Sequence, residues 1–140
     1  MTLTRRYRFA ASHRLNTDAL SPQENARLYG KCNYPFGHGH DYVLDVTVTG
    51  PVDGSGQIVN REALDALVGE RVLSCLDHRN LNCDVPELEG RVPTTENLSS
   101  AIERMLSSEW TLPAALACVR ISETARNTFE LTTPSSLPQN

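Results

Sequence analysis

The chain has little of what nucleic-acid-binding or membrane proteins rely on. Its 13 lysines and arginines are outnumbered by 17 aspartates and glutamates and form no long run, which argues against a nucleic-acid partner. No stretch approaches the ~20 consecutive apolar residues that a membrane-spanning helix needs, so we expect no membrane partner. The first residues, Met1-Thr2-Leu3-Thr4, lack the apolar segment of a secretory signal, and we therefore expect a cytoplasmic protein.

Cysteine pairs are also missing. The four cysteines include no CxxC pair, which argues against a structural zinc knuckle. An even number of cysteines is compatible with two disulfides, but cytoplasmic thiols stay reduced, and we expect all four to be free.

The remaining bulk properties are those of one folded domain. A chain of 140 residues, 39% hydrophobic and 21% charged, supports one hydrophobic core and leaves little room for a second. We expect a single domain over residues 1–140, with an ordered core over about 4–132. The end of the chain, residues 133–140, is predicted to be a flexible tail.

Hydrophobic periodicity predicts an α+β fold. Strict alternation of apolar and polar residues predicts strands, and apolar residues three or four apart predict helices. The predicted strands cover residues 5–14, 38–50, 114–123 and 128–132, and the predicted helices cover residues 61–76 and a segment that begins after Thr94 or Thr95. This order indicates an antiparallel sheet with two helices on one face. Since four strands leave open edges, we also expect the sheet to self-associate.

Three histidines form a candidate zinc site. His38 and His40 are two residues apart on a predicted strand, so both imidazoles point to the same face. His13 ends the first predicted strand, and the three rings converge if these two strands pair. Three protein ligands leave zinc an open fourth position, as in catalytic sites. The alternative is a chance pair, because spacing alone does not place His13 near the other two.

Cys32 is a candidate for proton-transfer chemistry beside that zinc. It precedes His38 by six residues, in a loop predicted over residues 15–37 that includes a helical turn at 22–28. The loop setting and the neighbouring Lys31 predict a lowered thiol pKa and a reactive thiolate. The competing role is a fourth zinc ligand, which would close the site.

Three further residues have both a functional and a plain interpretation. Asp77 can orient the ring of His78 and stabilise its protonated form; the alternative is a histidine that balances a helix dipole. Glu96 is equally explained by stabilisation of a helix N-terminus.

Glu123 ends the third predicted strand on the same face as Val119 and Ile121, and it is predicted to point inward. A buried carboxylate needs donors. A ligand with a guanidine-like edge would provide two.

Five segments, taken in order, resemble the 6-pyruvoyltetrahydropterin synthase family. The segments are residues 10–15, 30–33, 37–40, 76–81 and 94–97. Their combination is highly specific, and the resemblance covers roughly residues 4–132. It implies the tunnelling fold, with the element order strand–strand–helix–helix–strand–strand, and a hexamer of two trimers in which the sheets of each trimer close into a barrel.

The resemblance also implies roles for the residues above. The zinc ligands would be His13, His38 and His40, and the catalytic set would be Cys32, Asp77 and His78, with Asp77 and His78 supplied by a neighbouring subunit. Glu123 would anchor the amino-pyrimidine edge of a pterin, and Thr94, Thr95 and Glu96 would line the pocket. The implied substrate is 7,8-dihydroneopterin triphosphate, which loses triphosphate and rearranges to 6-pyruvoyltetrahydropterin.

Two other functions remain open. The family has a branch, 6-carboxytetrahydropterin synthase, that serves queuosine synthesis and places its cysteine closer to the histidine pair. Here the five residues 33–37 intervene between Cys32 and His38, which favours the pyruvoyl branch. The other alternative is a pterin-binding module without turnover, although Cys32 and His78 are both present. Residues 124–127, which follow Glu123, depart from the pattern of the family. The last predicted hairpin is therefore the part of the chain that resembles the family least.

Overall fold

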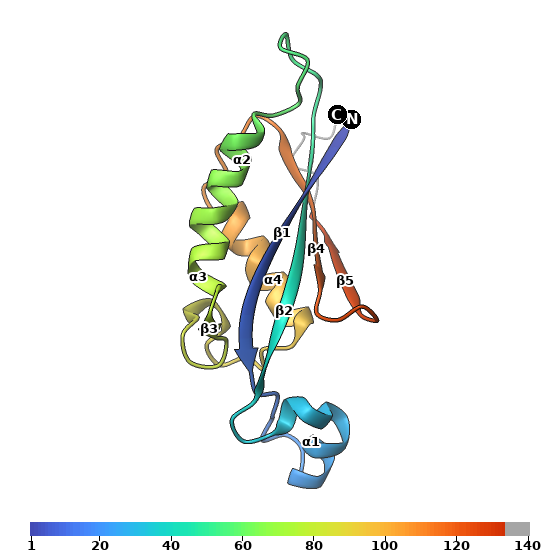
Figure 1. Ribbon diagram of the computed structural model, residues 1–140, viewed down its shortest axis with the longest axis vertical. Coiled ribbons are helices and arrows are strands. Elements are labelled where there is room, and N and C mark those ends of the chain that lie inside the picture. The colour runs from blue at the N-terminus through green and yellow to red at the C-terminus, as the bar shows by residue number, and fades with distance from the viewer. Residues whose placement is uncertain (134–140) are drawn as a thin grey trace.

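Two long strands form the centre of the fold. β1 (Thr2–His13) and β2 (His38–Thr49) pair antiparallel along their whole length in the computed structural model, which describes residues 1–133. β4 (Ala115–Ser122) pairs antiparallel with β2, and β5 (Thr128–Thr132) pairs with β4. The four strands predicted from alternation are confirmed, and they lie side by side in one twisted sheet (Figure 1).

The sheet has a fifth, very short strand. β3 (Arg79–Asn80) pairs with β1 at Ala11 and Ser12, and this pairing is parallel. The four predicted strands pair antiparallel as expected, and β3 is an additional strand that the sequence did not indicate, because two residues are too few to show alternation. The strand order is β3-β1-β2-β4-β5.

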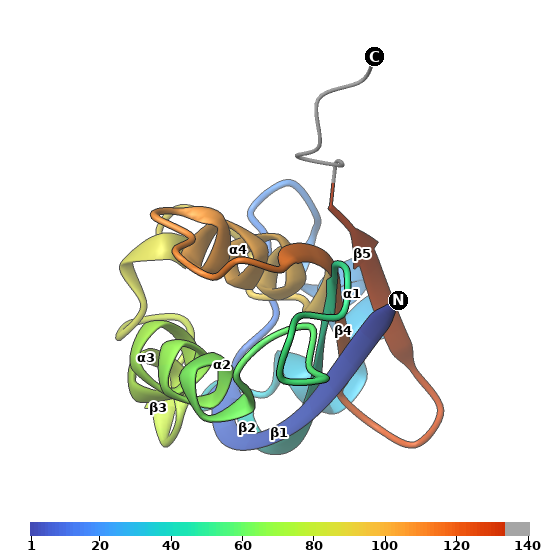
Figure 2. The ribbon, with the colours of Figure 1, turned by 90° about the horizontal axis from the view of Figure 1, so that it is seen from above.

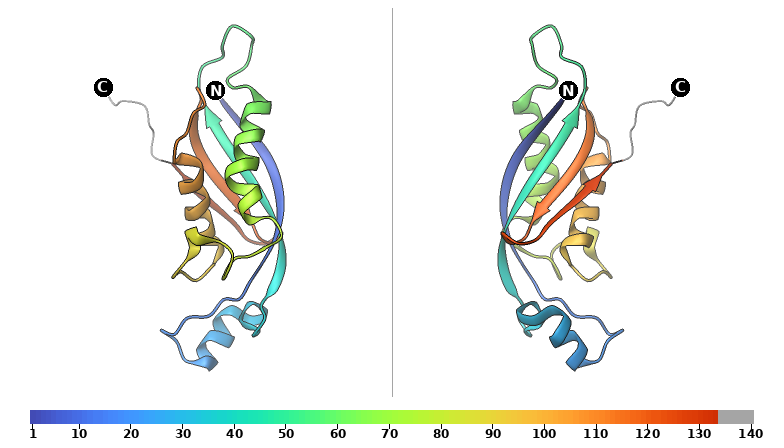
Figure 3. Two further views of the ribbon diagram at one scale, coloured as in Figure 1. Left: turned by 90° about the vertical axis from the view of Figure 1, so that its left-hand side faces the viewer. Right: turned by 90° about the vertical axis from the view of Figure 1, so that its right-hand side faces the viewer.

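Helices cover one face of the sheet and leave the other uncovered (Figures 2 and 3). The helix expected over residues 61–76 consists of α2 (Arg61–Val68) and α3 (Ser74–Leu76), joined by a π-helical turn at Gly69–Leu73. The π turn inserts one extra residue into the helix. The apolar side of the helix still faces the sheet after this insertion, since Val72 and Leu76 are buried.

The second predicted helix is α4 (Thr95–Ser107). It begins after Thr94, whose side chain accepts a hydrogen bond from the Asn97 N–H (3.2 Å). Of the two N-cap residues considered, Thr94 is the one that caps the helix. The α+β architecture is thereby confirmed.

The hydrophobic core lies between the helices and the sheet. Fully buried side chains from both layers meet there: Leu44, Val46, Leu64, Ile102 and Ile121. Where the core approaches the histidines, the rings of Phe9 and Tyr42 stack with centroids 5.0 Å apart. The ring of His40 packs against the ring of Tyr42 in an edge-on contact, with centroids 5.7 Å apart, so the stacked aromatic pair supports the position of His40.

The chain between β1 and β2, residues 14–37, forms a small lobe that extends beyond the end of the sheet (Figures 1 and 3). We call it the β1–β2 lobe. It contains α1 (Pro22–Tyr29), where only a helical turn was expected, followed by the short 3₁₀ helix η1 (Gly30–Asn33). A capping box starts α1: Ser21 Oγ accepts from the Glu24 N–H, and Glu24 accepts from the Ser21 N–H.

The chain end is bonded to the sheet as far as it is described. Thr133, the first residue of the expected tail, donates its N–H to the Ala117 carbonyl (2.9 Å). The rest of that expected tail, residues 134–140, lies outside the described residues. Among residues 1–133, none of the helices has the length and hydropathy to cross a bilayer.

Candidate metal centre

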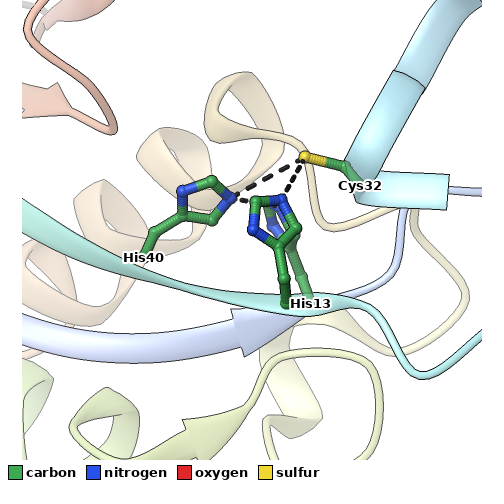
Figure 4. Close-up of side chains that lie close together, drawn as sticks. His13, Cys32 and His40 are labelled. Carbon is green, nitrogen blue, oxygen red and sulfur yellow. Dashed lines mark hydrogen bonds between the residues drawn. The ribbon is translucent and has the colours of Figure 1, made fainter. Parts of the chain in front are cut away.

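The register of β1 and β2 brings three histidines together. His13 is the direct partner of His38 across the two strands, and His40 is two residues further on the same face. The ligand atoms of these three residues and of Cys32 all lie within 4.8 Å of one another. Figure 4 shows His13, Cys32 and His40 pointing toward one another, with the cysteine reaching in from the β1–β2 lobe. The predicted convergence is confirmed.

The donor atoms lie close to the spacing that a tetrahedral zinc ion needs, except that Cys32 and His38 are closer together. Zn–N bonds of ~2.05 Å imply N···N distances of ~3.3 Å, and a Zn–S bond of ~2.3 Å implies S···N distances of ~3.6 Å. The two Nε2 atoms of His13 and His40 are 3.1 Å apart. Cys32 Sγ lies 3.0 Å from His38 Nε2 and 3.7 Å from His40 Nε2. Imidazole and thiolate donors suit zinc, so the residues fit either a three-histidine site or a closed site with Cys32.

His13 is held in the form that binds a metal. Its Nδ1 donates to the Pro93 carbonyl (3.0 Å), which directs Nε2 toward the other donors. The side chain is 1% exposed, and this burial lowers the pKa of His13 to about 4. The imidazole is therefore neutral at neutral pH. Nothing in the sequence pointed to Pro93, which is 80 residues away.

The position of Cys32 depends on a close backbone approach at the end of its loop. Gly37 has φ +65, and a Cβ there would lie 2.0 Å from the His13 carbonyl oxygen. Only glycine lets the loop pass this close to β1.

The predicted lowering of the Cys32 pKa is wrong for the chain alone. Burial and, secondarily, the Glu123 carboxylate raise the pKa of the thiol. The Lys31 side chain, expected to lower it, is exposed to solvent.

Glu123 points inward and has the donor that a buried carboxylate needs. Thr95 Oγ1 donates to its Oε2 (2.7 Å), and Thr95 is itself buried at the start of α4. The other oxygen, Oε1, lies 3.0 Å from His40 Nε2 and 3.6 Å from His13 Nε2. Burial lowers the pKa of His40 and outweighs the opposing effect of this carboxylate. The inward carboxylate therefore borders the metal centre.

A cavity of about 540 Å³ opens beside the metal centre. Six residues selected from the sequence line it: Cys32, His40, Thr94, Thr95, Glu96 and Glu123. The sequence did not indicate the other lining residues, among them Leu28 and Tyr29 of α1 and Asn127 of the β4–β5 loop. Leu28 and Tyr29 lie in a short helix with no apolar periodicity of its own, so no local signal marks them.

This site can be set beside known proteins. A family model described as "6-pyruvoyl tetrahydropterin synthase" matches residues 2–134. A 6-pyruvoyl tetrahydrobiopterin synthase of Dictyostelium discoideum is 47% identical over 126 residues, covering 89% of this chain and 90% of that protein. The chain belongs to the 6-pyruvoyl tetrahydropterin synthase family. The human 6-pyruvoyl tetrahydrobiopterin synthase is 42% identical over 127 residues, covering 89% of this chain and 86% of that protein.

The fold agrees with membership of this family. The solved structure of Caenorhabditis elegans 6-pyruvoyl tetrahydropterin synthase matches with a TM-score of 0.87 at 37% identity, covering 96% of both chains. The expected tunnelling fold is confirmed for the single chain, and in residues 1–133 the sheet is open at its edge strands β3 and β5.

Two residues that the family resemblance selects, Asp77 and His78, do not line the cavity beside the metal centre. Asp77 accepts a hydrogen bond from the Ala10 N–H (2.9 Å), and its other oxygen lies 3.7 Å from His78 Nε2. His78 has φ +60 and donates its N–H to the Ala10 carbonyl (2.6 Å), and its side chain is 82% exposed. Within one chain His78 is therefore exposed, and neither residue lines the cavity beside Cys32.

Proposed function

We propose that this chain is a zinc-dependent 6-pyruvoyl tetrahydropterin synthase, which converts 7,8-dihydroneopterin triphosphate to 6-pyruvoyltetrahydropterin and triphosphate in tetrahydropterin biosynthesis. The observation that carries this proposal is the convergence of three histidines and Cys32 beside a cavity that Cys32, His40 and Glu123 line. Family membership supports the same reaction.

The pterin would bind through Glu123. A carboxylate accepts two N–H bonds from a flat amino-pyrimidine edge, and such charge-assisted bonds are strong. Thr95 fixes the carboxylate by donating to one oxygen, while Thr94 and Glu96 line the same wall. A flat heterocycle would then lie between this polar wall and the side chains of α1.

The chemistry would take place at the end of the cavity where the histidines lie. His13, His38 and His40 would hold the zinc ion, which supplies a Lewis acid for the hydroxyl groups of the substrate side chain. Cys32 reaches the same point from the β1–β2 lobe and would accept a carbon-bound proton as its thiolate. Its Sγ lies 3.0 Å from His38 Nε2, so a substrate side chain held at the zinc would lie near this base.

A single chain would be incomplete as an enzyme. Neither Asp77 nor His78 lines the cavity beside Cys32 of its own chain, and in our proposal the pair serves the cavity of a neighbouring subunit. The edges β3 and β5 are open for pairing with other copies, in line with the proposed hexamer of two trimers. The cytoplasmic location stays a prediction from the sequence.

The proposal is tested by incubating purified, zinc-loaded protein with 7,8-dihydroneopterin triphosphate. We expect release of one triphosphate for each 6-pyruvoyltetrahydropterin formed. A 6-carboxy product with acetaldehyde would assign the chain to the queuosine branch. Absence of turnover with zinc bound would identify a pterin-binding module and would contradict the role of Cys32.

We predict that Glu123→Gln chiefly weakens substrate binding. The amide keeps the size and the Thr95 contact but presents one acceptor in place of two, and lost charge-assisted bonds cost about 1.5–3 kcal/mol. KM should therefore rise roughly 10-fold to 100-fold by the same principle, with bound zinc unchanged.

The matched control for this variant is Glu62→Gln on the exposed side of α2, which should leave KM as it is. An unchanged KM in Glu123→Gln, or loss of zinc together with unfolding, would contradict the binding role.

A further inference from the structure

Two backbone contacts hold the segment around Cys32 against the chain at the end of β1. One is a backbone bond, in which the Leu15 N–H donates to the Cys32 carbonyl (2.7 Å). The other is the close approach of Gly37 to the His13 backbone. These contacts hold the backbone at Cys32 and at Gly37. Residues 33–36, which lie between them, must be held by side chains.

Apolar burial does not hold residues 33–36 in place. Phe36 is 96% exposed and Tyr34 is 59% exposed, so the two aromatic side chains of the loop contribute little packing. Hydrogen bonds must therefore fix the loop relative to β1.

Asn33 makes those bonds. Its Nδ2 donates to the Leu15 carbonyl (2.8 Å) and to Asn16 Oδ1 (3.0 Å), so both amide hydrogens are used. Its own carbonyl accepts a bond from Arg14 Nε (3.2 Å). Asn33, the residue after Cys32, is thus bonded to the three successive residues that follow β1, namely Arg14, Leu15 and Asn16.

We propose that Asn33 is the positioning residue for Cys32: its side-chain amide holds the thiol against the three histidines by fastening the segment around Cys32 to Leu15 and Asn16, which follow β1. The proposal rests on the proposed function in assigning a catalytic role to Cys32. Asn33 is not among the residues that line the cavity, and in this proposal it acts only through the placement of its neighbour. A displacement of about 1 Å at a reacting group can cost ~100-fold in rate.

The test uses two variants in the zinc-loaded full chain. Asn33→Ala removes both donated bonds. Asn33→Asp keeps the shape but turns a carboxylate oxygen toward the Leu15 carbonyl and Asn16 Oδ1, so it cannot donate. The matched control is Asn82→Ala, because Asn82 likewise forms two side-chain bonds with the backbone, to the N–H (2.7 Å) and the carbonyl (2.9 Å) of Arg14, without a hydrogen bond to Cys32 or Asn33.

We expect both Asn33 variants to lose 10-fold to 100-fold in kcat, by the cost of misplacement, with KM within about twofold of the parent. Bound zinc should be retained. In the zinc-free proteins the Leu15 amide should exchange with solvent at least about 10-fold faster, while amides in the β1–β2 ladder keep their protection. Alkylation of Cys32 by iodoacetamide, followed by mass spectrometry, should accelerate. Asn82→Ala should match the parent in all of these measurements.

Parental kcat in Asn33→Ala and Asn33→Asp, despite faster exchange at Leu15, would overturn the proposal. So would equal losses in Asn82→Ala, which would indicate a general effect of loosening residue 14. If the parent itself does not turn over the pterin triphosphate, the proposed function fails separately. Amide exchange and alkylation would then still show whether Asn33 places the thiol, and parental values for both would overturn that claim.

Discussion

His40→Ala is expected to abolish zinc binding and turnover together. His40 is central among the donors, with its Nε2 3.1 Å from that of His13 and 3.7 Å from Cys32 Sγ. Removing a mere orienting partner of a metal ligand costs ~10-fold to 100-fold in affinity, and removing the ligand itself should cost more. We therefore expect zinc affinity to fall by more than ~100-fold by this comparison. Competition with a chromogenic chelator measures this loss.

The fourth histidine of the chain provides the control. His78 lies outside the ligand cluster and its side chain is 82% exposed, so His78→Ala should keep one zinc per chain. His40→Ala and His78→Ala should therefore differ in bound zinc, although under the proposed function both should lose turnover. Stoichiometric zinc in a folded His40→Ala protein would contradict the assigned ligand set.

Much of the metal centre could be predicted because strand geometry is strictly periodic. The alternation in residues 38–50 places His38 and His40 on the same face of their strand, and the alternation in residues 5–14 assigns His13 to one face of its strand. When the two strands pair, all three histidines lie on the same face of the sheet. What spacing alone could not supply was the register, and the structure pairs His13 directly with His38. A hairpin closed by a long lobe leaves the register undefined in the sequence.

The parts of the site that could not be predicted are contacts between distant segments. Thr95 and Glu123 are 28 residues apart and meet only because α4 packs against β4. The raised pKa of the Cys32 thiol likewise reflects burial and Glu123, whereas sequence reasoning considered only the adjacent Lys31. Electrostatics at a site depend on what folding brings close, and neighbours in sequence are a poor guide to it.

Cys32→Ala is expected to reduce turnover by ~100-fold to 10,000-fold, the range for loss of a positioned general base. It also distinguishes the two zinc arrangements that the geometry allows. If the three histidines are the ligands and Cys32 is the base, alanine should leave zinc affinity within ~10-fold of the parent, less than the cost of losing an orienting partner. If Cys32 is the fourth ligand, affinity should fall as steeply as in His40→Ala.

Cobalt substitution separates these cases without relying on turnover. A thiolate bound to cobalt gives an intense near-ultraviolet absorption band, which a three-histidine site lacks. We expect no such band in the parent, because proton transfer needs Cys32 free and the fourth position open. Cys83→Ala, at an exposed cysteine outside the cluster, should change neither the spectrum nor the rate. A band present in the parent and lost in Cys32→Ala would make Cys32 a ligand, and the base would then have to be sought elsewhere, first at His78 of a neighbouring copy.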